Sequence, residues 1–268
     1  MNNNNLNVIA KNIRRSIVEM IYESKSGHPG GSLSCTDIMT YLYFEKMNIN
    51  VQNPKDENRD RFVMSKGHAA PALYAVLAEK GFFPKEELMS LRKIGAMLQG
   101  HPDAKKIPGV DVSTGSLGQG ISNAVGMALG LKHKKSKSKV YAILGDGEIQ
   151  EGLVWEAAMA AGHYKLDNLV AILDYNGLQI DGKNEEVMNI SPVDKKFESF
   201  GWNVVACDGH DYEDIDKAFG KIVEGKPTMI IAKTIKGKGV SFMENEAGWH
   251  GQAPNLAQKE VALVELNK

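Results

Sequence analysis

The chain has 268 residues, of which 43% are hydrophobic and 24% charged, and its formal net charge is -1 at pH 7. This composition suits one large α/β domain or two small ones, with an ample core, and the near-neutral charge argues against a general nucleic-acid or membrane-surface partner. The 2 cysteines are too few for a disulfide framework or a cysteine metal cluster, and no apolar run reaches the roughly 18 residues of a transmembrane helix.

The N-terminal part of the chain is predicted to be mainly helical. Its Asn-rich start lacks the apolar core of a signal peptide, so the cytoplasm is the expected location. Apolar residues recur at helical spacing over 6–26, and 37–47 is predicted to be a second helix with Ser34 or Thr36 as its N-cap. The glycine-rich run 26–31 between them is expected to be a turn, because its proline disfavours helical geometry at the preceding residue.

Strands alternate with helices from residue 61 onward. The expected strands span 61–65, 140–144, 169–173, 203–207 and 228–233. The expected helices span 69–80, 84–93, the segment after 115–120, the Ala-rich stretch between the second and third strands, 193–200, 212–224 and 256–266. This alternation predicts an α/β fold with a mostly parallel central sheet, helices on both faces, and a ligand beyond the carboxyl ends of the strands.

We expect the whole chain, 1–268, to be a single domain. A helical lead-in (1–60) would precede an α/β core (61–235), and a loop with a C-terminal helix (236–268) would follow.

Two of the expected strands end on residues suited to holding a metal ion against a phosphate. The second strand breaks at a Gly-Asp-Gly turn, which places the carboxylate of Asp146 at the carboxyl edge of the sheet, and Asn176 follows the third strand. With the backbone carbonyl of Leu178, diphosphate oxygens and a water, these oxygens would complete a shell for Mg²⁺ or a looser one for Ca²⁺. Asp and Asn also favour turns, and a purely structural role is the alternative.

The glycine-rich turns do not match the common phosphate-binding motifs. No stretch fits the P-loop pattern, and two near matches to the dinucleotide fingerprint have Gln150 or Asn123 where the third glycine is required. The carboxylate of Asp146 would repel a bare pyrophosphate, whereas a divalent cation between them turns the repulsion into attraction. The sequence therefore favours a metal-bridged diphosphate over direct dinucleotide binding.

Further motifs run through the chain in a characteristic order. They are SGHPGG at 26–31, SKGHA at 65–69, GHP at 100–102, GSLGQG at 115–120, GDG at 145–147 with EG at 151–152, Asn176 about thirty residues after the GDG, and WHG at 249–251. GDG followed by Asn resembles the thiamine diphosphate fingerprint, and the whole group resembles the transketolase family over residues 10–255. The resemblance implies the diphosphate-binding fold of thiamine diphosphate enzymes, with thiamine diphosphate and Mg²⁺ (or Ca²⁺) as cofactors.

The resemblance also implies where the cofactor would lie. The metal would be held by Asp146, Asn176 and the Leu178 carbonyl. The residues at the diphosphate end and its turn would be His68, Gly147, Glu148, Lys236 and His250. Gly115 and Leu117 would border the middle of the thiamine, and Ile180 would pack on its rings.

The same resemblance implies the catalytic residues. His28 and His101 would face the hydroxyls of the substrate, His68 and His250 would act beside the diphosphate, and Glu151 would join a carboxylate relay at the subunit interface. Histidine suits proton transfer to sugar hydroxyls near neutral pH. Outside these motifs, we expect His133 on the surface, His163 as a capping or interface residue, and His210 as a turn residue, each without a catalytic role.

The resemblance implies transfer of a two-carbon ketol unit from a ketose phosphate to an aldose phosphate, as in the pentose phosphate pathway. Transketolases have three domains, and the match covers the first. The pyrimidine and C-terminal domains, with the glutamate that activates the cofactor, would therefore belong to a separate C-terminal subunit, in a heterotetrameric α₂β₂ assembly. A truncated piece of a longer protein is the rival explanation, although a polar residue after the last expected helix favours a natural end.

Two other functions remain open. Another thiamine diphosphate enzyme, such as half of a deoxyxylulose-phosphate synthase or the α subunit of a 2-oxoacid dehydrogenase, would keep Asp146 and Asn176, but SGHPGG and WHG argue against it. A non-catalytic regulatory or scaffold protein could retain the fold. The intact metal residues and the four motif histidines argue against that alternative.

Overall fold

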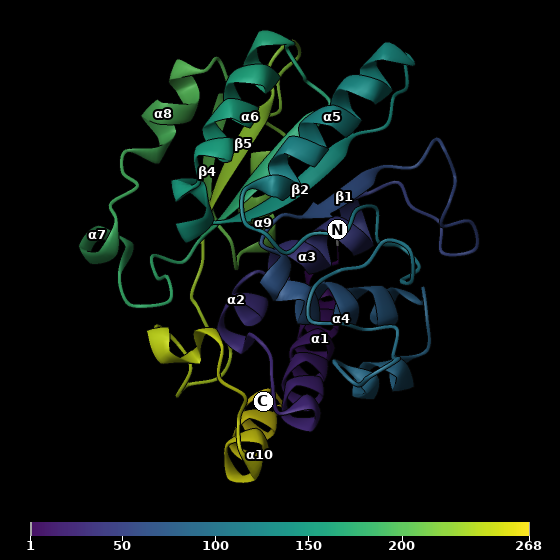
Figure 1. The fold of residues 1–268 in the computed structure, drawn as a ribbon, viewed down its shortest axis with the longest axis vertical. Helices are drawn as coiled ribbons and strands as arrows, with labels where there is room; N and C mark the ends of the chain where they lie inside the picture. Colours follow the sequence, from purple (N-terminus) through teal and green to yellow (C-terminus); the bar gives the residue numbers. More distant parts are fainter. Residues whose placement is uncertain (1, 268) are drawn as a thin grey trace.

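The computed structural model describes residues 2–267 and centres on a five-stranded sheet (Figure 1). Its strands are β1 (Arg61–Met64), β2 (Val140–Gly145), β3 (Leu169–Tyr175), β4 (Asn203–Asp208) and β5 (Thr228–Lys233). They lie in the order β1-β2-β3-β5-β4, and every neighbouring pair is parallel. The predicted α/β class with a parallel central sheet is confirmed, and all carboxyl ends meet at one edge.

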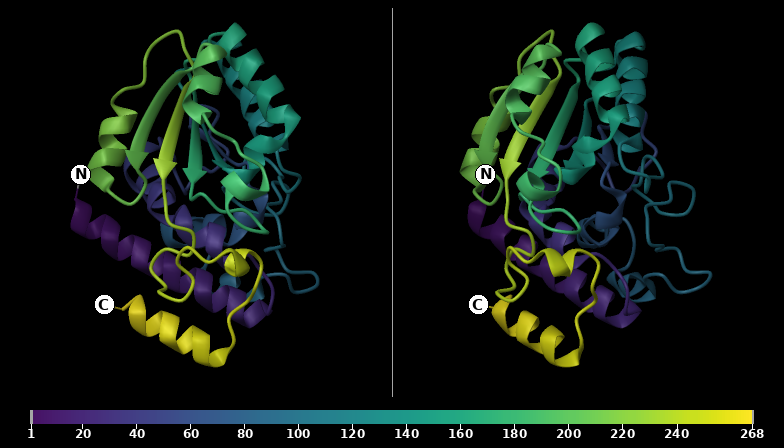
Figure 2. Two further views of the ribbon diagram at one scale, coloured as in Figure 1. Left: turned by 90° about the vertical axis from the view of Figure 1, so that its left-hand side faces the viewer. Right: turned by 60° about the vertical axis from the view of Figure 1, so that its left-hand side comes forward.

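Helices cover both faces of the sheet (Figure 2). One face packs against α5 (Gln119–His133), α6 (Gly152–His163) and α8 (Val193–Ser199). The core on the other face contains side chains of α9 (Tyr212–Phe219), which packs on the sheet, and of α1 (Asn3–Ser24), α3 (Thr36–Tyr41) and α4 (Ala70–Lys80). Side chains of β2 alternate between the two cores, since Ala142 and Leu144 join the first and Tyr141 and Ile143 the second. Burial on both faces explains why the strands have continuous apolar runs.

Shorter elements complete the fold. They are α2 (Pro29–Ser34), a π-helical turn (Leu42–Lys46), α7 (Asn184–Val187), α10 (Leu256–Glu265) and the 3₁₀ turns Gly67–Ala69, Lys85–Ser90, Gly147–Gln150 and Ala247–His250. Of the helices within residues 2–267, none has both the length and the apolar character required to cross a membrane.

Three predicted helical features were wrong. The expected helix 84–93 is a 3₁₀ turn over Lys85–Ser90. The expected helix 212–224 ends at Phe219. The expected turn at 26–31 becomes helical at Pro29, where proline occupies the first position of α2 and needs no hydrogen-bond partner for its nitrogen.

The N-cap of α3 also differs from the prediction. Cys35 occupies this position, and its side chain makes no capping hydrogen bond. The two expected caps have other partners, because the Ser34 hydroxyl donates to Asp174 and the Thr36 hydroxyl donates to the carbonyl of Ser32. Tertiary contacts therefore replace local capping here.

Gly162 on α6 is predicted to be intolerant of any side chain. A Cβ at this position would overlap the carbonyl oxygen of Phe200, whereas a Cβ at Gly130 on α5 would meet no atom within 4 Å. Gly162→Ala should lower the free energy of unfolding by about 1–3 kcal/mol or more. Gly130→Ala is the matched control and should raise it by about 0.5–1 kcal/mol. Urea unfolding followed by circular dichroism measures both, and equal stabilities would contradict the packing described.

Candidate functional site

A cavity of about 380 Å³ lies at the carboxyl edge of the sheet. The loops that follow β1, β2, β3 and β5 supply most of its walls, as expected for a parallel sheet. Most of the predicted site residues line this cavity: His68, Gly115, Leu117, Asp146, Gly147, Glu148, Glu151, Asn176, Leu178, Ile180, Lys236 and His250. His28 and His101 adjoin it without lining it, since His28 packs against two of the lining histidines and His101 lies next to Gly115.

The three predicted metal donors belong to the turns after β2 and β3. The carboxylate of Asp146 is held by two backbone amides, with its Oδ1 accepting from Gly147 over 2.8 Å and its Oδ2 from Gly177 over 2.6 Å. The Asn176 Oδ1 accepts from the amide of Leu178 over 3.2 Å. Register pairs the last residue of β2 with Asp174 of β3, which brings the two turns together.

These donors suit a divalent cation. Burial, together with the nearby charge of Asp174, raises the pKa of Asp146 to about 6. A carboxylate in this environment lacks charge compensation, which a cation would provide. Residues 2–267 contain no group of three or more His, Cys, Asp or Glu side chains arranged to hold a metal. An ion here would therefore need the amide and carbonyl oxygens, with the rest of its shell coming from its ligand.

Three histidines cluster at one side of the site, where His68 and His250 line the cavity and His28 packs against both. The rings of His28, His68 and His250 lie with centroids 5.0 to 5.4 Å apart. Burial lowers the pKa of His28 and of His250 to about 4 and that of His68 well below its usual value, and nearby cationic side chains act in the same direction. The rings are therefore neutral at pH 7. Within residues 2–267, the buried Nδ1 of His28 has no hydrogen-bond partner, which leaves it available to a ligand.

Lys66 and Asp174 form a buried ion pair in the lining of the cavity. The Lys66 ammonium also donates to the Gly31 carbonyl over 2.6 Å, and Asp174 accepts from the hydroxyls of Ser34 and Thr234. Burial disfavours the charged form of Lys66, but Asp174 outweighs it and raises the pKa of Lys66. The pair joins α2 and the segments after β1 and β5 to strand β3. The predicted end of β3 before Asp174 was wrong, because the strand continues to Tyr175.

Glu148 connects three segments of the chain through hydrogen bonds of its carboxylate. Its Oε1 accepts from the Ser65 hydroxyl over 2.5 Å and from the Gly118 amide over 3.0 Å, and its Oε2 accepts from the Gly145 amide over 2.9 Å. The buried carboxylate thus holds the glycine-rich turn at 115–120 against the ends of β1 and β2. Its predicted contact with a cofactor stays a prediction.

Both apolar and polar side chains are exposed at the rim of the cavity. Ile180 is 65% exposed although it is a large apolar side chain. Glu151 is exposed at the N-cap position of α6, and its side chain makes no capping hydrogen bond. His101 lies further out, where burial and then Arg92 lower its pKa. These features would suit a surface that another molecule covers.

Sequence reasoning missed two residues that line the cavity and shape it, Lys66 and Asp174. Their position at the ends of β1 and β3 was a signal, because charged residues next to buried strands need partners. Their pairing could not be found locally, since the two residues are 108 positions apart.

Comparison with known proteins identifies relatives along nearly the whole chain. Residues 6–267 match the family model "Transketolase, thiamine diphosphate binding domain". The chain is 47% identical over 257 residues to an apulose-4-phosphate transketolase subunit of Phocaeicola vulgatus, covering 95% of this chain and 91% of the relative. It is 46% identical to the 6-deoxy-6-sulfo-D-fructose transketolase subunit SqwG of a Clostridium species, covering 96% and 94%.

Single-chain relatives are matched over only part of their length. The transketolase of Rattus norvegicus is 47% identical over 258 residues, and the match covers 96% of this chain but 41% of the relative. The structure of transketolase from Leishmania mexicana superimposes with a TM-score of 0.94 at 32% identity, covering 98% of this chain and 41% of that one.

Proposed function

The chain belongs to the transketolase family through its thiamine diphosphate binding domain, and we propose that it is the N-terminal subunit of a two-chain transketolase. One observation carries this proposal: a single cavity is lined by the proposed metal donors Asp146 and Asn176 and by His68 and His250, against which His28 packs. The relatives support it, since this chain spans over nine-tenths of two proteins named as subunits but 41% of single-chain transketolases. A C-terminal subunit would supply the pyrimidine and C-terminal domains, in an α₂β₂ assembly.

Thiamine diphosphate with Mg²⁺ (or Ca²⁺) is the proposed cofactor. Asp146, Asn176 and the Leu178 carbonyl would hold the metal, because their oxygens belong to the two adjoining turns after β2 and β3 that line the cavity. The diphosphate would lie against Gly147, His68, His250 and Lys236, and the apolar part against Gly115, Leu117 and Ile180. When bound, this cofactor supplies the carbanion stabilisation that two-carbon transfer requires.

His28 and His101 would bind and orient the sugar substrate. Because the ring of His28 is neutral at pH 7, it can accept a hydrogen bond at one nitrogen while donating from the other. The unpartnered Nδ1 of His28 is the atom that we assign to a substrate hydroxyl. His101, at the outer edge, would contact a hydroxyl further from the reacting carbon.

The partner subunit would cover the rim that carries Glu151 and Ile180. An exposed Ile180 loses unfavourable contact with water when another chain covers it, and the exposed Glu151 carboxylate is free to reach across an interface. Glu151 would then take part in the proposed carboxylate relay to the cofactor-activating glutamate of the partner.

The reaction class is tested by product analysis with the partner present. We expect transfer of a two-carbon ketol unit from a ketose phosphate, or from a donor like those in the relatives' names (apulose 4-phosphate, 6-deoxy-6-sulfo-D-fructose), to an aldose phosphate. Mass spectrometry of mixtures with isotope-labelled donors identifies the transferred carbons. Products of 2-oxoacid decarboxylation would instead indicate another thiamine diphosphate enzyme, and cofactor binding without turnover would indicate a scaffold.

His28→Ala should separate substrate chemistry from cofactor binding. The variant loses the ring proposed to face the substrate, so the turnover number of the reconstituted enzyme should fall by about 100-fold. Calorimetry should find thiamine diphosphate affinity nearly unchanged, because His28 does not line the cavity. His163→Ala, which removes an exposed histidine, is the control and should behave like the unmodified chain. Equal turnover in both variants would refute the role of His28.

A further inference from the structure

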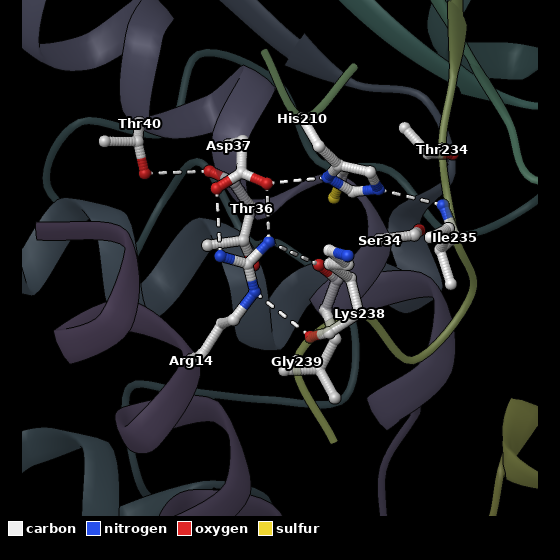
Figure 3. A network of polar contacts seen from close by, with 12 residues as sticks. Arg14, Ser34, Thr36, Asp37, Thr40, His210, Thr234, Ile235, Lys238 and Gly239 are labelled. Carbon is white, nitrogen blue, oxygen red and sulfur yellow. Dashed lines mark hydrogen bonds and ion pairs between the residues drawn. The ribbon is translucent and has the colours of Figure 1, made fainter. Parts of the chain in front are cut away.

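A second polar network lies outside the cavity and centres on Asp37 in α3 (Figure 3). Arg14 of α1 donates to both of its carboxylate oxygens over 2.9 and 2.7 Å, and the Nδ1 of His210 lies 2.6 Å from its Oδ2. Burial raises the pKa of Asp37, but Arg14 and then His210 outweigh it and hold that pKa well below its usual value. The carboxylate is therefore ionised and can orient the imidazole of His210.

The network makes hydrogen bonds to the segment that follows β5 at two residues, one on either side of Lys236. The backbone N–H of Ile235 donates to His210 Nε2 over 2.9 Å, and the Arg14 Nε donates to the carbonyl of Lys238 over 3.1 Å. Because Nε2 accepts a hydrogen bond, the imidazole proton must reside on Nδ1, from which it points to Asp37. Figure 3 shows this series of contacts running from Arg14 through Asp37 and His210 to Ile235.

Lys236 depends on its backbone for its position. It is 2% exposed and lines the cavity, where its Nζ lies 3.1 Å from His250 Nδ1 and 3.4 Å from the Leu178 carbonyl. Among residues 2–267, no carboxylate forms an ion pair with it, and burial lowers its pKa to about 8. The position of its ammonium therefore depends on these two contacts and on the backbone that carries the side chain.

The outer side of this segment is not tightly packed. A cavity of about 510 Å³, separate from the first, is lined by His210, Thr234, Ile235 and Lys238. The turn that carries His210 is anchored at the preceding residue, where the Gly209 amide donates to the Lys233 carbonyl over 2.8 Å. The hydrogen bond to His210 holds the outer side of this segment, while on its inner side the Gly237 amide donates to the Gly30 carbonyl and the Lys236 carbonyl accepts from the Asn245 amide, each over 3.0 Å.

We propose that His210, oriented by Asp37, is a positioning residue that helps to hold Lys236 beside His250 in the cavity. The inference rests on the proposed function, which assigns the diphosphate of the cofactor to Gly147, His68, His250 and Lys236. His210 touches neither substrate nor cofactor, and acts through the amide of Ile235.

Three measurements on the cofactor-free chain test this positioning role. In His210→Ala, the Ile235 amide loses its acceptor, so hydrogen exchange across 234–239 and acetylation of Lys236 should each rise up to about tenfold, while β5 stays protected. Affinity for inorganic pyrophosphate with Mg²⁺ should fall about three- to tenfold. His210→Gln keeps an acceptor of similar reach and should restore most of the unmodified behaviour. His133→Ala, at an exposed helix end, is the control.

Unchanged exchange and acetylation in a folded His210→Ala would overturn the inference, as would equal effects of His210→Ala and His210→Gln. A further measurement needs no loss-of-function variant: NMR of isotope-labelled histidine should find His210 as the Nδ1–H tautomer at pH 7. An Nε2–H tautomer would also overturn it. These readings use the cofactor-free chain, so a failure of the unmodified chain to bind thiamine diphosphate would count against the proposed function alone.

Discussion

The purified chain is expected to catalyse no two-carbon transfer by itself and to gain this activity when its partner chain is added. Activation of the cofactor needs a free carboxylate at the aminopyrimidine, and the acidic side chains lining the cavity have other positions or partners. Glu148 and Asp174 are buried and engaged in hydrogen bonds, Asp146 lies at the proposed metal position, and Glu151 lies exposed at the rim. The measurement is a coupled assay with xylulose 5-phosphate and ribose 5-phosphate.

Reconstitution also tests the role of Glu151. Glu151→Gln removes the exposed charge at the rim and should lower the activity of the mixed chains at least about tenfold. Glu57→Gln is the matched control, since Glu57 is an exposed acid before the amino end of β1, at the opposite edge of the sheet. Full activity from this chain alone would refute the two-chain proposal, and an unaffected Glu151→Gln would refute the relay.

Asp146→Ala should abolish metal-dependent cofactor binding. The substitution deletes the one carboxylate among the three proposed metal donors, and the dissociation constant of thiamine diphosphate with Mg²⁺ should rise at least about 100-fold, which is about 2.7 kcal/mol. Isothermal titration calorimetry with and without Mg²⁺ or Ca²⁺ measures the effect. Unchanged affinity would show that the metal lies elsewhere.

The fold should survive the loss of Asp146. Its carboxylate accepts hydrogen bonds from Gly147 and Gly177, but burial and Asp174 make its charge unfavourable, so the two effects of removal oppose each other. The melting temperature should therefore change little. Asp181→Ala, an exposed acid on the neighbouring turn, is the control and should keep both stability and binding.

Local patterns were sufficient to predict every strand of the sheet. Each strand has a continuous apolar run that ends at glycine or polar residues, as at Gly145, so its limits are visible within a few positions. The helical predictions failed where tertiary contacts, rather than the local sequence, determine whether a segment is helical. All six residues of α2 are buried, and its stability comes from neighbouring elements rather than from its glycine-rich sequence.

The motifs also predicted most of the residues around the cavity, because the carboxyl ends of parallel strands must meet at one edge. They did not predict how those residues are held. His210 was expected to be a turn residue without a functional link, yet its ring contacts Asp37, which is 173 positions away in the chain. Hydrogen bonds at such separations leave no periodic signal in the sequence.

The amino-acid order alone was thus enough for the succession of strands and helices, the oxygen and imidazole donors, and the family that they indicate. The three-dimensional packing decided the strand order β1-β2-β3-β5-β4, the burial of the Lys66–Asp174 pair, and the network from Arg14 to Ile235. The physical reason is the separation along the chain over which each effect acts. Propensity and periodicity act over a few residues, whereas burial and ion pairing depend on which distant segments the folded chain brings together.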